Sequence, residues 1–429
     1  MRVKFCLVLA TVFLVTVGFL PAKKQKNTNV QFVYGDEFFK SGQFNTARKI
    51  FKSVLKDDKD NVLARVRLGY IDLLFNRLQE AEKYLSEALK LKPGESFPSM
   101  LLAEVLYRQD KMVESGAVYE SLMRPDIAQK LKSFGGMAPY FFSSGPSETV
   151  VPFQATDPLP LVKVRLNDGE DVYFIIDTGS SELIVNRSLA ESTGMMMFES
   201  IREDKEEEES LPYGHGRLDR LIIGDWEIKN LPVHTMDMGP YSSLGGGRRV
   251  DGILGTVFFY HFLTTLDYPG NRLVLRRKTA ENLQKMEKET ARSGRVIAPF
   301  LLAGDHFILA WGSVNKSEPI MFFVDTGLAG GGFACPPSTV QEAGISLSNP
   351  EDVGKARGGK RFIKVRVEKV ALGDAVRENV LCLYDIFPRA LENMFGFRVG
   401  GLVSHDFFRP YSVTFDFDGM RIILVEEKT

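Results

Sequence analysis

The sequence of 429 residues predicts a multi-domain protein in which an all-α helical repeat region precedes an all-β region made of two similar lobes. Apolar residues recur at helical spacing before residue 130, whereas short β-branched and aromatic runs dominate beyond residue 150. Four sequence blocks of the second region also occur twice, in the same order. These observations predict six segments: an apolar leader over 1–22, helical repeats over 28–130, a linker over 131–149, a first β lobe over 150–278, a connector over 279–296 and a second β lobe over 297–429.

The leader has the features of a secretory signal peptide. Arg2 and Lys4 precede an apolar run over 5–20, which has the length of a signal sequence and is short for a membrane span. We expect cleavage near Gly18 or Ala22 and export to the periplasm or the medium. The alternative is an uncleaved segment that attaches the protein to a membrane, because the lysines that follow suit an anchor equally well.

Composition excludes some partners and cofactors. Lys and Arg together number 54 against 55 Asp and Glu, so no overall charge favours nucleic acid. Cys335 and Cys382 remain after the leader, and we expect two buried small side chains, although an oxidising compartment would permit one disulfide. The five histidines lack the spacing of a zinc site, and no phosphate-binding glycine loop occurs. We therefore expect neither a metal nor a cofactor.

The helical region repeats with a period of 34 residues. Small residues recur where paired helices must approach closely, and large residues recur where they fill the gap between helices. The small set is Gly35, Gly69 and Ala103, and the large set is Phe51, Leu85 and Tyr119. With Pro93 near the end of the second unit, this pattern resembles the tetratricopeptide repeat. That resemblance implies a surface that binds a protein partner, and a packing platform for the β lobes is the equal alternative.

The β region is a duplication. "FIIDTG", which contains Asp177, returns as "FFVDTG" with Asp325, 148 residues later. Three further blocks return after 149 residues, among them "TLDYPGNRLVL" at Thr265 and "TFDFDGMRIIL" at Thr414. Coincidence does not explain four matched blocks, so one lobe is present twice.

A pair of aspartates at one point can hydrolyse a peptide bond. The apolar strand before each aspartate directs its carboxylate to a buried place, where an unpaired charge is costly. Two lobes related by a pseudo-twofold axis would bring both carboxyls to one water, with one proton shared between them. The ionised carboxylate takes a proton from the water, and the protonated one donates to the carbonyl oxygen. No acyl-enzyme forms.

Each Asp-Thr-Gly turn is followed by a Gly-containing apolar segment, "GILG" at 252–255 and "GLVS" at 401–404. This order resembles the aspartic peptidases, specifically the bacterial retropepsin-like members with their bilobal acid-protease fold. The resemblance implies an aspartic-type endopeptidase that acts on peptides or unfolded proteins, with Asp177 and Asp325 as the catalytic pair. It also implies that the threonines brace the two turns through their hydroxyls, that the glycines let backbone amides approach the carboxylates, and that Ser180 donates a hydrogen bond to the first aspartate. Independently of the resemblance, the glycine of each turn is expected to allow a backbone conformation closed to other residues. These supporting residues are Thr178, Gly179, Ser180, Thr326 and Gly327.

The first lobe also contains a candidate flap. In "LPYGHGRL", Tyr213 precedes Gly214 and Gly216, which resembles the flap tip of pepsin-like enzymes, although an ordinary hairpin would have the same residues. The acidic run over 202–210 is expected to be a solvated loop, and steering of cationic peptides is the alternative.

Two departures from the family pattern lie in the second lobe. Leu328 replaces a small or hydroxylic residue, and Ser404 replaces a glycine, so we expect a lost hydrogen bond to Asp325 and crowding behind its turn. An inactive or catalytically weak protein that binds peptides or acts as a scaffold is therefore the main alternative. A third hypothesis makes the repeats the functional part, but it does not explain why both turns are retained.

Overall fold

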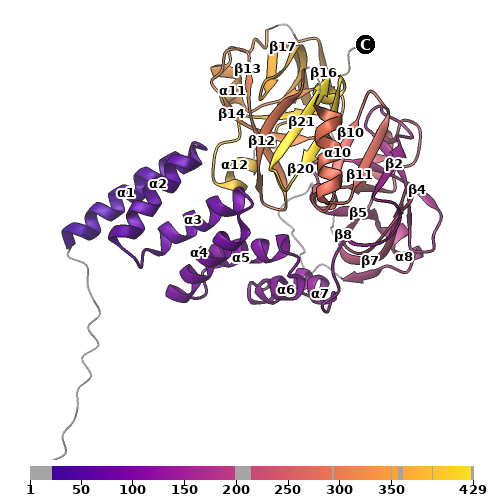
Figure 1. Ribbon diagram of the computed structural model, residues 1–429. Helices are drawn as coiled ribbons and strands as arrows, with labels where there is room; N and C mark the ends of the chain where they lie inside the picture. Colours follow the sequence, from indigo (N-terminus) through magenta and orange to yellow (C-terminus); the bar gives the residue numbers. More distant parts are fainter. Residues whose placement is uncertain are drawn as a thin grey trace, which may run out of the picture.

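The computed structural model describes residues 22–198, 214–291, 294–348, 350–355, 361–388 and 390–426 (Figure 1). Most of the predicted leader and the acidic run over 202–210 therefore lie outside the described residues. Among the described helices, none has the length and apolar character needed to cross a membrane.

The N-terminal region consists of three helical pairs and a seventh helix. The helices form a row in which α3 contacts β12 (Val296–Ala303) at the second lobe and α7 contacts β7 (Gly214–Ile223) of the first lobe (Figure 1). Their bounds are α1 Ala22–Lys40, α2 Phe44–Asp57, α3 Val62–Leu74, α4 Leu78–Leu91, α5 Ser96–Arg108, α6 Met112–Ser121 and α7 Pro125–Lys132.

The predicted small and large positions meet inside the helical pairs. A Cβ on Gly35 would lie 2.8 Å from Phe51 Cε1, and a Cβ on Gly69 would lie 2.7 Å from Leu85 Cγ. Each glycine therefore allows the two helices of its pair to approach closely. The two glycines are 34 residues apart in the sequence, as the repeat period predicted. In the third pair, the Ser115 hydroxyl donates to the Ala103 carbonyl at 2.8 Å and is satisfied despite burial.

The first lobe is an eight-stranded sheet in the order β1-β8-β5-β9-β4-β3-β7-β6. The Gly- and Ser-rich interval predicted as a linker contributes β1, because Phe142 packs against Trp226 with ring centroids 5.2 Å apart. The elements of this lobe are β1 Phe141–Ser144, β3 Leu161–Leu166, β4 Asp171–Ile176, β5 Leu183–Asn186, α8 Arg187–Ser192, β6 Met196–Phe198, β7 Gly214–Ile223, β8 Trp226–Met236, η1 Gly239–Gly245, β9 Gly252–Leu254 and α9 Thr256–Tyr260.

The second lobe repeats this arrangement. In each lobe the strand before the aspartate pairs in parallel with the later glycine-containing strand, β4 with β9 and β14 with β19. The elements are β13 Phe307–Val314, β14 Ile320–Asp325, β15 Phe333–Ala334, α11 Pro337–Glu342, β16 Asp352–Lys355, β17 Arg361–Leu372, β18 Ala375–Tyr384, α12 Ala390–Phe395, β19 Gly401–Ser404 and α13 His405–Phe408.

Six strands join the lobes in the order β12-β21-β20-β10-β11-β2, and helix α10 forms the predicted connector. Thr265 on β10 pairs with Thr414 on β20, and their hydroxyl oxygens are 2.8 Å apart. These threonines are equivalent in the duplication, so the pseudo-twofold axis passes between them. The bounds are β2 Glu148–Pro152, β10 Leu263–Asp267, β11 Arg272–Arg276, α10 Ala280–Thr290, β12 Val296–Ala303, β20 Tyr411–Asp416 and β21 Arg421–Glu426.

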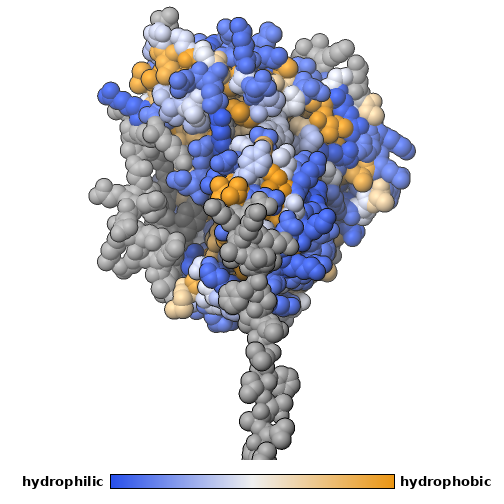
Figure 2. All heavy atoms as spheres, turned by 90° about the vertical axis from the view of Figure 1, so that its left-hand side faces the viewer, coloured by the Kyte–Doolittle hydropathy of each residue, from blue (hydrophilic) through white to orange (hydrophobic). Residues whose placement is uncertain are grey.

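The repeats share a hydrophobic core with the second lobe. Phe397, just beyond α12, lies among Phe39, Phe44 and Tyr70 of the repeats at ring distances of 4.9 to 6.5 Å. The Tyr70 hydroxyl also donates to the Phe395 carbonyl at 2.9 Å. This face of the repeats therefore packs against the protein's own lobe. On the side shown in Figure 2, hydrophilic residues predominate and apolar residues form small separate patches.

Candidate active site

The two aspartates lie at equivalent ends of central strands. Asp177 directly follows β4, and Asp325 is the last residue of β14. The strand residues before each are buried, including Phe174 and Phe322. Each apolar run is buried on both faces of its sheet, and this burial fixes where the strand ends. The end of the strand in turn fixes the position of the carboxyl group.

The two turns approach each other so closely that only glycine fits. A Cβ on Gly179 would lie 2.4 Å from Asp325 Oδ1, and a Cβ on Gly327 would lie 2.2 Å from Asp177 Cγ. Neither glycine has a positive φ, so the prediction that glycine supplies a conformation closed to other residues is wrong. Glycine is needed here because the opposite carboxyl group occupies the space of a side chain.

The two threonines link the turns symmetrically. The amide of Thr178 donates to Thr326 Oγ1, and the amide of Thr326 donates to Thr178 Oγ1, both at 3.0 Å. Each hydroxyl then donates across the axis, to the carbonyls of Val324 at 2.8 Å and Ile176 at 3.3 Å. These four buried hydrogen bonds hold the lobes in one register at the aspartates.

The carboxyl groups differ in their hydrogen-bond donors. Asp177 accepts from the Gly179 amide at 2.7 Å and from the Ser180 hydroxyl at 2.9 Å. Asp325 accepts from the Gly327 amide at 2.8 Å, and Leu328 offers it no hydroxyl. Burial raises the pKa of Asp177, although Ser180 and Asp325 act against this effect. Burial and the charge of Asp177 raise the pKa of Asp325 well above its usual range.

The residue behind each turn also differs between the lobes. A Cβ on Gly255 would lie 2.3 Å from the Ser181 carbonyl oxygen, so glycine is required there. Its counterpart Ser404 is fully buried, and its hydroxyl lies within hydrogen-bond distance of the carbonyls of Asp325 and Leu328. The Ser404 hydroxyl therefore braces the backbone of the Asp325 turn from behind.

The candidate flap is placed only in part. Tyr213 lies outside the described residues, whereas Gly214 and Gly216 lie within β7. Both glycines pair with β8, and a Cβ on Gly214 would lie 2.3 Å from Thr235 Oγ1. They therefore belong to the strand of the β6–β7 hairpin, and close packing explains why Gly214 has no side chain.

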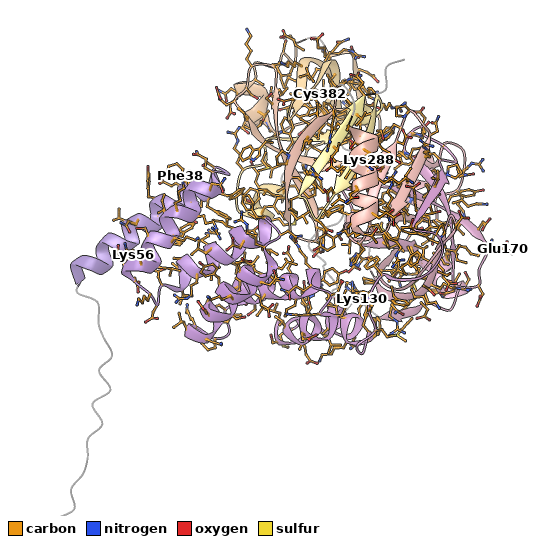
Figure 3. The ribbon with its side chains drawn as sticks, viewed as in Figure 1. Phe38, Lys56, Lys130, Glu170, Lys288 and Cys382 are labelled. Atoms are coloured by element: carbon orange, nitrogen blue, oxygen red, sulfur yellow. The ribbon has the colours of Figure 1, made fainter. Side chains whose placement is uncertain are left out.

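Sequence reasoning missed a buried charged cluster beside the first turn. Glu182, five residues after Asp177, accepts from the Lys130 ammonium at 2.7 Å and from the Tyr107 hydroxyl at 2.6 Å. Lys130 lies on α7 where this helix meets the first lobe (Figure 3). The sequence did contain a signal for this cluster, because a single glutamate stands between the Asp-Thr-Gly turn and a buried strand. A charge in such a place needs a partner.

The two cysteines of the second lobe are both buried. Cys335 and Cys382 are buried free thiols, and the neighbouring Cys335 together with burial raises the pKa of Cys382. Within the described part of the chain, no group of three or more His, Cys, Asp or Glu side chains could hold a metal ion.

Two β lobes that meet at paired Asp-Thr-Gly turns define an acid-protease fold, preceded here by helical repeats. Residues 162–258 match the family model described as aspartyl protease, and residues 38–105 match that of the tetratricopeptide repeat. The aspartyl protease match lies in the first lobe and the tetratricopeptide match lies in the helical region, which agrees with the resemblance seen in the sequence.

No curated protein matches the chain. Among solved structures, a mutant of the O-GlcNAc transferase of Thermobaculum terrenum aligns at 19% identity with a TM-score of 0.23. That alignment covers 27% of this chain and 21% of the transferase chain.

Proposed function

We propose that this protein is an aspartic-type endopeptidase that cleaves peptides or unfolded proteins. The observation that supports this function best is the close approach of the Asp177 and Asp325 turns, in which each carboxyl group lies against the glycine of the opposite lobe. Two carboxyl groups brought together in this way cannot both ionise readily, so they share one proton. Such a pair can act as a base and an acid at one water molecule.

The unequal surroundings assign the two roles. The Ser180 hydroxyl stabilises ionised Asp177, whereas Asp325 has the more strongly raised pKa. Asp177 therefore takes a proton from the water molecule as the water oxygen bonds to the carbonyl carbon of the peptide. At the same time, Asp325 gives its proton to the carbonyl oxygen. The resulting diol returns a proton to Asp325 as the C–N bond breaks, and the leaving amine takes the proton from Asp177. No covalent enzyme intermediate forms.

Export and partner binding are parts of the same proposal. The apolar leader supports a periplasmic or secreted location, with membrane attachment if the leader is retained. N-terminal sequencing of the protein from its native host distinguishes these outcomes. The tetratricopeptide match supports a protein-binding role, in which the repeats dock a partner or the substrate.

A peptide-binding protein without catalysis is the second candidate function. Leu328 favours it, because the Asp325 carboxyl has no hydroxyl donor like the one that Ser180 gives to Asp177. In that case the cleft would hold a peptide, while the dyad would activate water poorly.

The test is cleavage of an unfolded protein and of a peptide library by the purified mature protein over a range of pH. The endopeptidase proposal expects internal peptide bonds to be cut and a statine-type inhibitor to stop the cutting. Binding of that inhibitor without cleavage at any pH would establish the peptide-binding alternative instead. Neither binding nor cleavage would contradict both functions.

A further inference from the structure

Glu182 connects the first aspartate turn to the helical repeats. The turn runs from Asp177 to Glu182, and β5 begins at the next residue. Within it, the Ser180 hydroxyl holds the Asp177 carboxylate, and the Ser181 carbonyl accepts from the Val257 amide at 2.9 Å. The position of residue 182 therefore helps to set where Ser180 and Asp177 lie.

The Glu182 side chain is held by two helices of the repeat region. Lys130 on α7 donates to both carboxylate oxygens, at 2.8 and 2.7 Å, and Tyr107 on α5 donates at 2.6 Å. Glu182 is 5% exposed and Lys130 is 2% exposed, so water does not compete for these bonds. Burial opposes ionisation, but Lys130, together with His234 on β8 and the Tyr107 hydroxyl, outweighs it, and the pKa of Glu182 falls to about 2. A buried ion pair of this kind permits one geometry, because any displacement leaves a charge without its partner.

The same helix also contacts the strand that follows residues 199–213. Asp126 lies one turn before Lys130 on α7, and its carboxylate is 3.3 Å from His215 Nε2 on β7. Farther along β7, the Arg217 guanidinium donates to the Ser133 carbonyl beyond α7. Helix α7 therefore contacts both the aspartate turn and the β6–β7 hairpin of the first lobe.

The second lobe lacks this arrangement. The contact of Glu182 with the repeats is therefore not part of the pattern that the two lobes share. The residue equivalent to Glu182 is Gly332, because Leu183 and Phe333, which follow them, pair with the equivalent residues Val233 and Cys382. Gly332 is buried, and a Cβ there would lie 2.8 Å from Val380 Cγ1, whereas the Glu182 side chain is covered by the repeat helices. The glutamate thus occurs in the copy whose aspartate turn is covered by α5 and α7.

We propose that Glu182, held by Lys130 and Tyr107, is a positioning residue for the Asp177 turn, so that the active site is complete only when the repeat helices are docked. This inference rests on the proposed peptidase function. It gives the repeats a role within the site itself, in addition to any partner that they bind.

The test compares Lys130→Met and Tyr107→Phe with Lys132→Met in the full-length protein. Lys132 is the matched control, because it lies on the same helix and pairs with Glu120 at the surface. We expect Lys130→Met to lower kcat per folded molecule about tenfold or more, since small displacements of catalytic groups cost this much. KM should stay within about twofold, because substrate binding is unchanged. The control should keep wild-type values.

Amide hydrogen exchange over 177–186 supplies a second measurement that needs no activity. Both test variants should exchange faster there than the wild type, and Lys132→Met should not. If Lys130→Met does not fold, Tyr107→Phe decides, because it removes a single hydroxyl group. Wild-type kcat and exchange in the folded variants, even with a lower melting temperature, would overturn the inference. If the wild type cuts nothing, the proposed function fails, and exchange alone decides whether the repeats position the turn.

Discussion

Replacing Ser180 with alanine tests the assignment of Asp177 as the base. The Ser180 hydroxyl donates to Asp177 Oδ2 at 2.9 Å, and a hydrogen bond to a charged group contributes about 1.5–3 kcal/mol. Ser180 is partly exposed, so water replaces part of the bond and the low end applies. Losing about 1.4 kcal/mol of stabilisation of the ionised Asp177 carboxylate corresponds to a shift of about one unit in its pKa.

The direction follows from which form the bond favours. The hydroxyl stabilises ionised Asp177, so its removal raises the pKa of that carboxyl group. The acidic limb of the kcat/KM profile should therefore move to higher pH by about one unit, with about tenfold less activity on that limb.

The assay is cleavage of one peptide by Ser180→Ala and by the wild type across the pH range. Ser181→Ala is the matched control, because Ser181 holds the turn through its backbone carbonyl. An acidic limb that stays in place, or that moves to lower pH, would refute the assignment.

Three further predictions use the same structure. Leu328→Ser adds a hydroxyl donor beside Asp325, so the alkaline limb of the pH profile should move to lower pH, and an unchanged limb would contradict this. Gly179→Ala should abolish cleavage, because its Cβ would lie 2.4 Å from Asp325 Oδ1, and activity within about tenfold of wild type would contradict the close approach. Stability to urea should fall as pH falls from 6.5 to 4, because burial lowers the pKa of His234 from 6.5 to about 4 and the unfolded state binds the proton first. It should fall again from 4.5 to 2 by up to about 3 kcal/mol, because Glu182 has a pKa of about 2 in the folded state against 4.5 ordinarily, and a flat profile would contradict this.

The duplication allowed much of the fold to be predicted from sequence. The nearly equal spacing of Asp177 from Asp325 and of Thr265 from Thr414 predicted two lobes related by a pseudo-twofold axis, and the paired threonines lie on that axis. The repeat period likewise predicted which small residues face large ones between paired helices. These features are local or periodic, so they can be recognised in the sequence itself.

Contacts between the repeats and the lobes could not be predicted in this way. Lys130 and Glu182 are 52 residues apart in different regions, and no periodic pattern links them. The role of Gly179 depended on the opposite lobe, so local turn chemistry suggested the wrong cause. The hydrogen bonds of Ser404 to the backbone of the Asp325 turn likewise depend on how that turn is shaped.

The central claim is that carboxyl groups from two lobes act as one catalytic site. The variant Asp325→Asn tests this claim most directly. It removes the proposed acid in the second lobe, where Leu328 and Ser404 depart from the family pattern, and it conserves the shape of the side chain. Cleavage of one peptide should be measured for this variant and for Asp177→Asn, with matched melting temperatures to show that both are folded. We predict that each variant loses cleavage while the wild type retains it. Cleavage by either variant at the wild-type rate would contradict the shared dyad.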